Sequence, residues 1–318
     1  MSITGTTMSG NIAASEGGAF YAYYATATTV TNSTFANNQS GTTGGAIDFY
    51  GQKNVVKGSK FIGNTSGTGG GAIHFNGLAT AENSLEVVAS TFIGNSSAAG
   101  GAIIADSGGK LKTTAGIFSA NRASGTGGAI AVSGSGGAVK EFTVAGGVFT
   151  ENSGGSGGAI DTDGDWKISI ASAKFRLNRT IAQDGGALYL RSSSTISVVS
   201  SLFSENFAAD DGGGFLTGGT GVATLTGITA INNTAGGEGG GIAVFAGTAT
   251  ISKSLVRGNY AGDQGGGLDL YGPVTVKTTI VTGNVAKTSY GGIYSDAILT
   301  LPPTVKVFGN FAPSHPNV

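Results

Sequence analysis

Apolar residues return along the chain at nearly fixed intervals, in two columns separated by a run of small residues. The stretch FIGNTSGTGGGAIHF, residues 61–75, places Phe61 three residues before Asn64 and then Ile73 behind glycines. The same arrangement appears as FANNQSGTTGGAIDF at 35–49 and as FSANRASGTGGAIAV at 118–132. Between these units lie alternating runs such as STISVVSSLF and GTATISKSLV. Alternation predicts β-strands, because side chains on a strand point in turn to its two faces.

The polar residue that follows the first apolar column shows how regular the repeat is. The asparagines at this position are spaced 25 to 31 residues apart. They are Asn11, Asn38, Asn64, Asn95, Asn121, Asn152, Asn178, Asn206, Asn233, Asn259, Asn284 and Asn310. Three residues earlier stand Phe35, Phe61, Phe92, Phe118, Phe149, Phe175 and Phe203, followed by Ala230, Val256, Val281 and Val307. The second column is Phe20, Ile47, Ile73, Ile103, Ile130, Ile160, Leu188, Phe215, Ile242, Leu268 and Ile293.

Short strands repeated in one register predict an all-β fold, a single-stranded parallel β-helix (β-solenoid) in which each turn of chain is one coil. Coils stack at the inter-strand spacing of roughly 4.8 Å, so about 11 coils would make one elongated domain over residues 1–318. We expect the Phe column to stack inside the rod, facing the second column. Each Asn is expected in a buried turn, donating its side-chain NH2 to the amide oxygen of the next coil.

The two ends of the chain differ in composition. Residues 1–10 are predicted to form an incomplete first coil, whose open edge favours end-to-end self-association. Four of the five prolines fall within residues 302–318. Proline cannot donate to a strand ladder, so this segment is predicted to cap the last coil.

The composition argues against several classes of protein. A formal net charge of -1 over 318 residues, without a Lys or Arg cluster, argues against nucleic-acid binding and against a polybasic membrane anchor. The sequence contains no apolar run of about 18 residues, so we expect no membrane insertion by this segment. The first residues also lack the features of a signal peptide. We therefore interpret the chain as an excised segment of a longer secreted protein.

The paired motifs FxxN and GGA[ILV] resemble the repeats of chlamydial polymorphic outer membrane proteins and related bacterial surface proteins. The resemblance extends from Asn11 to Asn310. It implies a right-handed parallel β-helix of the passenger type, secreted to a cell surface and used in adhesion. The family's C-terminal translocation barrel is missing, and from Ala230 onward Ala or Val replaces the motif Phe.

The resemblance favours a non-enzymatic, extracellular protein that acts in adhesion or as a structural spacer or filament element. Its expected partners are glycans or proteins of a host or neighbouring cell surface. The main alternative is a β-helix that binds or degrades polysaccharides.

Residues just after the second column, and those two places further on, are predicted to point outward. They give a candidate ligand face of rings, carboxylates and amides: Tyr21, Tyr23, Asp48, Tyr50, His74, Asn76, Asp161, Asp163, Tyr189, Arg191, Asp269 and Tyr271. Such a face suits an extended polysaccharide, since rings stack on sugars and polar groups reach hydroxyls. Tyrosine is also a good strand residue and aspartate keeps an exposed sheet soluble, so both interpretations remain open.

An enzyme would use acids from this face. The candidates are Asp48 beside His74, one coil apart, or Asp161 with Asp163. Glycosidases need two carboxyls about 5 to 9.5 Å apart, a separation that neighbouring coils can supply. Polysaccharide-degrading β-helices, however, gather several acids with Arg, Lys or His in one cleft. Here the acids are scattered among Ala, Ser and Gly, so we assign no catalytic residue.

A weak calcium site is the only cofactor that the sequence suggests. DTDGDW, residues 161–166, resembles the opening of a calcium loop through Asp161, Asp163 and Asp165. Trp166, however, stands where such a loop has Gly. An acidic, solvated turn is the competing interpretation.

A second acidic feature follows from the alignment of the repeats. Three consecutive coils carry Asp184, Asp211 and Glu238 four residues before the second column. Carboxylates stacked near the strand spacing of about 5 Å repel one another unless they splay, gain protons or share a cation. We therefore hypothesise a cation-sensitive ladder, with splaying into water as its alternative.

Overall fold

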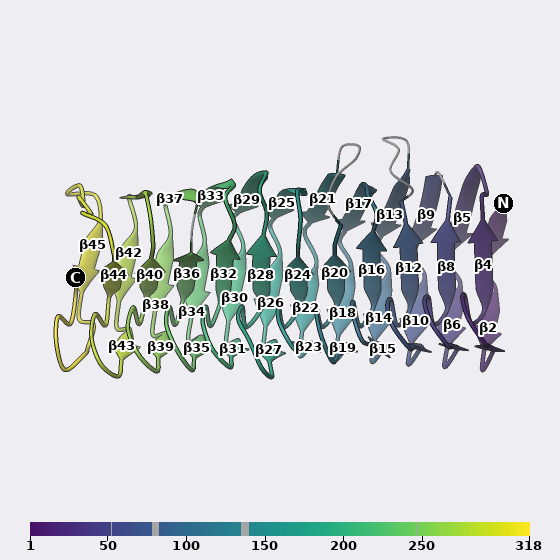
Figure 1. Ribbon diagram of the computed structural model, residues 1–318, viewed down its shortest axis with the longest axis horizontal. Coiled ribbons are helices and arrows are strands. Elements are labelled where there is room, and N and C mark those ends of the chain that lie inside the picture. Colours follow the sequence, from purple (N-terminus) through teal and green to yellow (C-terminus); the bar gives the residue numbers. More distant parts are fainter. Residues whose placement is uncertain (52, 78–82, 135–139, 246) are drawn as a thin grey trace.

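The computed structural model describes residues 1–51, 53–77, 83–134, 140–245 and 247–318. Within these residues the chain forms strands joined by turns and bends, without a helix. The strands make four parallel sheets that run the length of a rod (Figure 1). Apart from β42 and β45 at the C-terminal end, neighbouring strands of a sheet lie four apart in the strand order, so each coil up to β44 adds one strand to every sheet. The predicted all-β solenoid of about 11 turns is therefore confirmed.

Sheets 1 to 4 are numbered in the order in which the chain first enters them. Sheet 1 contains β1 (Ser2–Thr4), β5 (Ala27–Thr31), β9 (Lys53–Lys57), β13 (Ser84–Val88), β17 (Gly109–Thr114), β21 (Lys140–Ala145), β25 (Lys167–Ala171), β29 (Thr195–Val199), β33 (Val222–Thr226), β37 (Thr248–Ser252) and β41 (Val274–Lys277). Sheet 2 contains β2 (Thr7–Ser9), β6 (Thr34–Ala36), β10 (Lys60–Ile62), β14 (Thr91–Ile93), β18 (Ile117–Ser119), β22 (Val148–Thr150), β26 (Lys174–Arg176), β30 (Leu202–Ser204), β34 (Thr229–Ile231), β38 (Leu255–Arg257), β42 (Ile280–Thr282) and β45 (Lys306–Phe308).

The other two sheets complete each coil. Sheet 3 contains β3 (Ile12–Ala13), β7 (Gln39–Ser40), β11 (Thr65–Ser66), β15 (Ser96–Ser97), β19 (Arg122–Ala123), β23 (Ser153–Gly154), β27 (Arg179–Thr180), β31 (Phe207–Ala208), β35 (Thr234–Ala235), β39 (Tyr260–Ala261) and β43 (Val285–Ala286). Sheet 4 contains β4 (Phe20–Tyr23), β8 (Ile47–Tyr50), β12 (Ile73–Asn76), β16 (Ile103–Asp106), β20 (Ile130–Val132), β24 (Ile160–Thr162), β28 (Leu188–Arg191), β32 (Phe215–Gly218), β36 (Ile242–Phe245), β40 (Leu268–Leu270) and β44 (Ile293–Ser295).

The repeat determines the register, because equivalent residues of successive coils pair directly. Phe61 on β10 pairs with Phe35 on β6 and with Phe92 on β14. Ile73 on β12 pairs in the same way with Ile103 on β16. All of these side chains are completely buried. A shift of one residue would turn both apolar columns to solvent, so burial holds every coil in line with the next.

The phenylalanines from Phe35 to Phe203 form one continuous stack inside the rod. Their ring centroids lie 4.7 to 5.0 Å apart, and their planes are 4° to 18° from parallel. In the next coil the position belongs to Ala230, and the ring of Phe215 lies 4.8 Å from that of Phe203. A large residue in the second column thus fills space that a small one leaves in the first, which keeps the interior densely packed.

The asparagine column forms a hydrogen-bonded ladder beside this stack. The side-chain NH2 of Asn38 donates to Oδ1 of Asn64 at 2.9 Å, and the backbone N–H of Asn38 donates to the same oxygen at 3.0 Å. Asn64 in turn donates to Oδ1 of Asn95 at 2.9 Å and to the carbonyl of Phe35 at 3.0 Å. Equivalent bonds continue through Asn121, Asn152, Asn178 and Asn206. The ladder therefore satisfies these buried amides within the protein.

The glycines before each second-column residue are required by the corner between sheets 3 and 4. Gly70 has a φ of +64°, in the left-handed region, and a Cβ on Gly71 would lie 2.2 Å from the carbonyl oxygen of Gly101. A side chain would therefore be strained at the first position and would collide with the next coil at the second. The glycines let successive corners stack at the strand spacing.

At the C-terminal end, residues 311–317 lie against the last coil. The N–H of Gly292 donates to the carbonyl of Pro316 at 2.9 Å, and the N–H of Ile293 to the carbonyl of Asn317 at 2.8 Å. Nδ2 of Asn310 donates to Oδ1 of Asn317 at 3.3 Å. Asn317 thus takes the place of a next ladder asparagine. At the other end, β1 to β4 supply one strand to each of the four sheets.

Candidate functional site

The outer face of sheet 4 carries the predicted ligand residues. The first of the two predicted outward positions, directly after the second apolar column, is covered in several coils. Four of the predicted residues are at most 7% exposed: Asp48, His74, Asp161 and Asp269. The prediction that these side chains face solvent is wrong. The turn that leads into each strand folds across this face, and a Cβ on Gly69 would lie 3.1 Å from the side chain of Ile104. The turn therefore covers side chains that point away from the core.

The second predicted outward position, two residues after the first, is more accessible to solvent. Tyr23 and Asp163 are exposed there. The half-buried residues at these positions are Tyr50, Asn76, Arg191 and Tyr271. At the first position, Tyr21 is 39% exposed and Tyr189 is half-buried. The candidate face is therefore a strip beyond the turns rather than the whole sheet.

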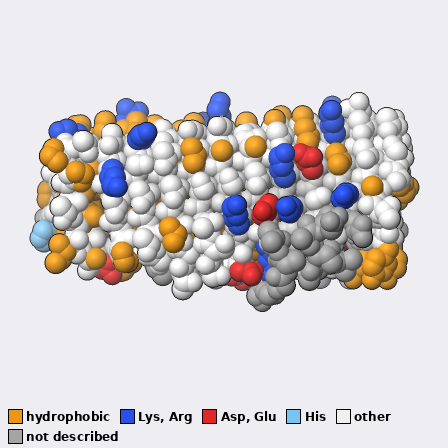
Figure 2. All heavy atoms as spheres, turned by 90° about the horizontal axis from the view of Figure 1, so that it is seen from above, with side chains coloured by type: hydrophobic (Ala, Val, Ile, Leu, Met, Phe, Trp, Pro, Cys, Tyr) orange, Lys and Arg blue, Asp and Glu red, His pale blue; other side chains and the backbone are white. Residues whose placement is uncertain are grey.

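Tyrosines gather at the N-terminal end of this strip. Tyr23 stacks on Tyr50 with ring centroids 5.4 Å apart and meets Tyr24 edge-on at 4.4 Å, while Tyr21 lies 5.6 Å from Tyr23. Tyr23 is 60% exposed and Tyr24 is 59% exposed. Figure 2 shows hydrophobic side chains gathered at this end of the rod. We call these four residues the tyrosine cluster.

A histidine bridges two carboxylates on the neighbouring coils. Nδ1 of His74 lies 2.8 Å from Oδ2 of Asp48, and Nε2 lies 3.2 Å from Oδ2 of Asp106. The hydroxyl of Thr43 donates to the same oxygen of Asp48 at 2.6 Å. Burial lowers the pKa of His74, but hydrogen bonds to Asp106 and Asp48 outweigh burial and raise the pKa to about 10. The imidazole is therefore cationic at neutral pH and unsuited to act as a general base.

In the middle of the rod, an arginine compensates the charge of Asp161. Nη2 of Arg191 donates to Oδ1 of Asp161 at 3.0 Å, and the hydroxyl of Ser156 donates to the other oxygen. The guanidinium also lies 4.6 Å from the ring centre of Tyr189. Burial raises the pKa of Asp161, although the charge of Arg191 opposes the rise. This carboxyl is thus held by its neighbours rather than presented to a cleft.

The acids of DTDGDW do not converge on one point. Nζ of Lys140 lies 2.8 Å from Oδ1 of Asp165, while Asp161 is paired with Arg191. Asp163, Asp165 and Arg191 line an open hollow of about 390 Å³. Among the described residues, these acids do not form a group that could hold one ion. The geometry therefore gives this turn internal ion pairs and no ready calcium loop.

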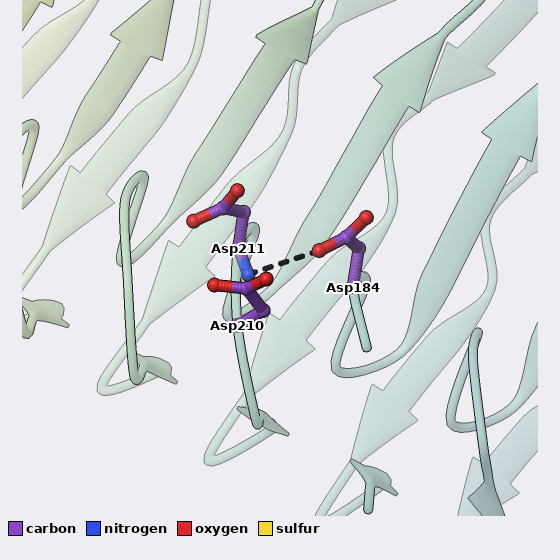
Figure 3. Close-up of side chains that lie close together, drawn as sticks. All are labelled: Asp184, Asp210 and Asp211. Atoms are coloured by element: carbon purple, nitrogen blue, oxygen red, sulfur yellow. Dashed lines mark hydrogen bonds between the residues drawn. The ribbon is translucent and has the colours of Figure 1, made fainter. Parts of the chain in front are cut away.

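Acids of consecutive coils do meet in the turns between sheets 3 and 4. Carboxylate oxygens of Asp184, Asp210 and Asp211 lie within 4.8 Å of one another (Figure 3). The N–H of Asp211 donates to Oδ1 of Asp184 at 3.2 Å, and the N–H of Glu238 donates to Oδ1 of Asp211 at 2.6 Å. Burial and the charges of neighbouring acids together raise the pKa of Asp211 to about 7, although the hydrogen bond from the N–H of Glu238 opposes the rise. Sequence analysis missed Asp210 as a member of this group.

Glu238 turns its carboxylate toward the following coil. It accepts hydrogen bonds from the hydroxyl of Tyr271 at 3.0 Å and from the side-chain amide of Gln264 at 3.3 Å. Asp269 beside it is 0% exposed, and no N–H or O–H group of the described residues donates to either of its carboxyl oxygens. Burial, together with a hydrogen bond to Glu238 and the negative charge of Glu238, raises the pKa of Asp269 to about 9.

Other members of these clusters were also missed from the sequence. Tyr24 was overlooked because it follows the end of its strand, and its φ of 49° places it in the left-handed region. Thr43 and Ser156 stand five residues before Asp48 and Asp161. A hydroxyl residue at this fixed spacing from an aspartate is a signal that could have identified the covered carboxyls.

Comparison with known proteins supports the family suggested by the repeat. The model of the Chlamydia polymorphic membrane protein repeat matches residues 5–23. No match was found among the curated proteins or among the solved structures. In the part of the chain that the structure describes, no helix has the length and apolar character needed to cross a membrane. The matched repeat and the four parallel sheets fit a β-helix whose repeats are similar to those of the polymorphic membrane proteins.

Proposed function

We propose that the chain is a non-enzymatic β-helix displayed on a cell surface, where it acts in adhesion. The tyrosine cluster carries this proposal, because two of its four rings are more than half exposed on a regular rod. Exposed aromatic groups that do not fill the core are typical of interaction surfaces. The matched repeat belongs to a family of membrane proteins, which supports the location.

A neutral glycan is the ligand class that suits the tyrosine cluster best. The exposed faces of Tyr23 and Tyr24 offer stacking surfaces for sugar rings, and their hydroxyls offer hydrogen bonds. Among the described residues, the acids Glu16, Asp48 and Asp106 act on or lie beside the cluster, and the cation His74 offsets part of their charge. This balance would repel an acidic polysaccharide.

Cleavage of the glycan is less well supported than binding. A glycosidase needs one carboxylic acid free to protonate the leaving oxygen and a second free to act as base or nucleophile. Asp48 and Asp161 are buried and bound by His74 and Arg191. We therefore propose recognition without hydrolysis.

The proposal is tested by incubating the full chain with soluble polysaccharides and following both retention of the protein and new reducing ends. Neutral β-glucan and galactomannan and acidic polygalacturonate and heparan sulfate form a suitable panel. We expect retention by at least one neutral polymer, weaker or absent retention by the acidic ones, and no new ends. New reducing ends would contradict the non-enzymatic proposal, and no retention by any polymer would favour a spacer role.

Matched substitutions locate the binding surface. The double change Tyr23→Ser and Tyr24→Ser should abolish retention, because it removes both exposed rings. Tyr260→Ser is the control, since Tyr260 is 40% exposed but lies on β39 of sheet 3. Retention that survives the double change but not the control change would place the ligand elsewhere on the rod.

A further inference from the structure

Three buried aspartates occupy the same position of the repeat in different coils. Asp48, Asp161 and Asp269 are each the second residue of their sheet 4 strand, on β8, β24 and β40. They are 1%, 2% and 0% exposed. A buried carboxylate is strongly disfavoured unless a cation or hydrogen-bond donors compensate its charge. The three sites therefore face the same electrostatic problem.

Two of the sites solve this problem with a cation from the following coil. His74, which pairs with Asp48 in the sheet register, contacts it at 2.8 Å. Arg191, two residues beyond the register partner of Asp161, contacts that carboxylate at 3.0 Å. A hydroxyl five residues upstream also donates to each carboxylate.

In the described part of the chain, the third site has neither a cation nor a hydroxyl donor as partner. Tyr294 pairs with Asp269 in the register, and Asp296 stands two residues further on, where the equivalent of Arg191 would be. Five residues upstream of Asp269 stands Gln264, whose amide donates to Glu238 and to Tyr271 instead. An acid thus replaces the base, and the covering side chain is turned away from the buried carboxyl.

The groups that act on Asp269 from the surrounding elements are acidic. Glu238 and Asp211 reach it from the turns of the preceding coils and Asp263 from its own turn, while Tyr271 follows it in the same coil. On the flanking strands, its register partners are Ala243 on β36 and Tyr294 on β44. No Lys, Arg or His of the described residues contacts Asp269, and both of its buried oxygens lack a donor, so the ionised form beside the charge of Glu238 is strongly disfavoured.

We propose that Asp269 and Glu238 share one proton and form a hydrogen-bonded acid–carboxylate pair that fastens the covering turn to sheet 4. The carboxylic acid of Asp269 donates to Glu238, which also accepts from Tyr271 and Gln264. When the proton leaves to solvent, two adjacent carboxylates remain and repel each other. The turn over residues 261–266 then loosens, and with it the hydrogen bonds of Tyr271 and Gln264.

The electrostatics of the site agree with this geometry. Burial and Glu238 raise the pKa of Asp269 to about 9 from its ordinary value of 3.8. The folded chain therefore holds the proton at neutral pH, whereas the unfolded chain has lost it. Stability from this proton is fully present below about pH 4 and is lost as pH rises through about 9.

The pair also supports an aromatic group at this end of the rod. The ring of Tyr271 lies 5.0 Å from Phe245 and 5.6 Å from Tyr294. Tyr290 continues the group at 5.1 Å from Tyr294. Because the hydroxyl of Tyr271 is anchored on Glu238, loss of the shared proton should release this ring first.

The direct test is a carbon-13 NMR titration of the Asp269 side-chain carboxyl in the full chain, from pH 3 to 10, with the signal assigned by Asp269→Asn. We expect a midpoint several pH units above that of an exposed aspartate. A midpoint near the ordinary value would overturn the proposal. In Glu238→Gln the new amide can donate to ionised Asp269, so its midpoint should fall, and an unchanged midpoint would equally overturn it.

Hydrogen exchange gives a second, structural readout. With intrinsic exchange rates corrected for pH, the amides of residues 261–272 should lose protection at least tenfold between pH 7 and 10. Asp269→Asn should keep its protection over this range, because an amide cannot lose a proton there. Asp48→Asn serves as the control, because Asp48 is a buried aspartate at the same repeat position. In this variant the amides of residues 261–272 should still lose protection as the pH rises. A loss of protection that persists in Asp269→Asn would overturn the proposal.

Discussion

Asp48 and Asp269 occupy the same repeat position near opposite ends of sheet 4, yet their charges are handled in different ways. Asp48 lies between the hydroxyl of Thr43 and the cationic ring of His74. Asp269 has no donor to its carboxyl oxygens among the described residues and faces Glu238. The backbone register is the same at both sites. The comparison shows that the repeat places an aspartate in the same buried position, while side chains of the adjacent coils determine whether it is protonated.

Asp161 shows that a compensating cation is not confined to the N-terminal end of the rod. Its coil lies in the middle of the rod and uses Arg191 as the cation and Ser156 as the hydroxyl donor. Two different bases therefore serve the same purpose at two coils. The C-terminal site is the exception, and it is also where Asp296 stands in place of the base.

Removing the cation should have the largest effect. His74→Ala leaves Asp48 buried without its charged partner, and this should cost about 3–5 kcal/mol of unfolding free energy at neutral pH. Denaturant unfolding would measure the change. His315→Ala is the matched control, because His315 is exposed and should change stability by less than about 0.5 kcal/mol. Equal effects of the two substitutions would show that the bridge to Asp48 contributes nothing specific.

The pH dependence should distinguish the two sites next. The pKa of His74 is raised from 6.5 to about 10, so its proton contributes fully below pH 6.5 and the contribution is lost as pH rises to 10. The difference in stability between wild type and His74→Ala should therefore shrink over this window. Melting curves from pH 6 to 10 would measure it. A difference that stays constant or grows with pH contradicts the assigned charge state.

Supplying a base to the C-terminal site should have a smaller, opposite effect. Asp296→Arg places a cation where Arg191 stands relative to Asp161, and this should stabilise ionised Asp269. Because position 296 is exposed, we expect a gain of about 0.5–1 kcal/mol at pH 9 and less at pH 5. The control is the double variant Asp296→Asn with Ala297→Arg, which changes the net charge by the same amount but places the cation one residue away. If both variants gain equally, the effect is one of net charge rather than of position.

The acidic turns should give the smallest response. Asp184, Asp210 and Asp211 bring their oxygens within 4.8 Å, so we expect calcium at a millimolar concentration near its dissociation constant to add about 0.4 kcal/mol of stability. Replacing all three by Asn should remove the response, and calorimetric melting with and without calcium measures it. A wild-type melting temperature that does not change with calcium, or a calcium-dependent increase that the triple variant retains, would count against the cation-sensitive ladder.

The sequence was sufficient for the coils, because each depends on a local spacing that recurs. The Phe and Asn columns lie where FxxN predicts them, since stacking identical residues in register is the only arrangement that buries both. The exchange of size between Phe215 and Ala230 was not predicted. It depends on two columns meeting across the interior, which spacing along the chain does not reveal.

The site could be predicted only in part. The alternation correctly indicated that Asp48 and Asp161 point away from the core, but their burial depends on the path of the turn above them. That path follows from stacked glycine corners such as Gly70 and Gly71, and thus from contacts between coils. The partners His74 and Arg191 are likewise set by contacts between coils. The sequence pattern within one coil therefore identifies the carboxyl groups but does not reveal the cations of the following coil that bind them.

The most direct test of the proposed adhesive role is the affinity of the tyrosine cluster for a soluble β-glucan oligosaccharide. Calorimetric titrations would compare the wild type, the double variant Tyr23→Ser with Tyr24→Ser, and the control Tyr260→Ser. We predict saturable binding by wild type and control, and binding by the double variant at least about tenfold weaker, or roughly 1.4 kcal/mol. Equal affinity of all three proteins, or no saturable binding by the wild type, would contradict glycan recognition by these tyrosines.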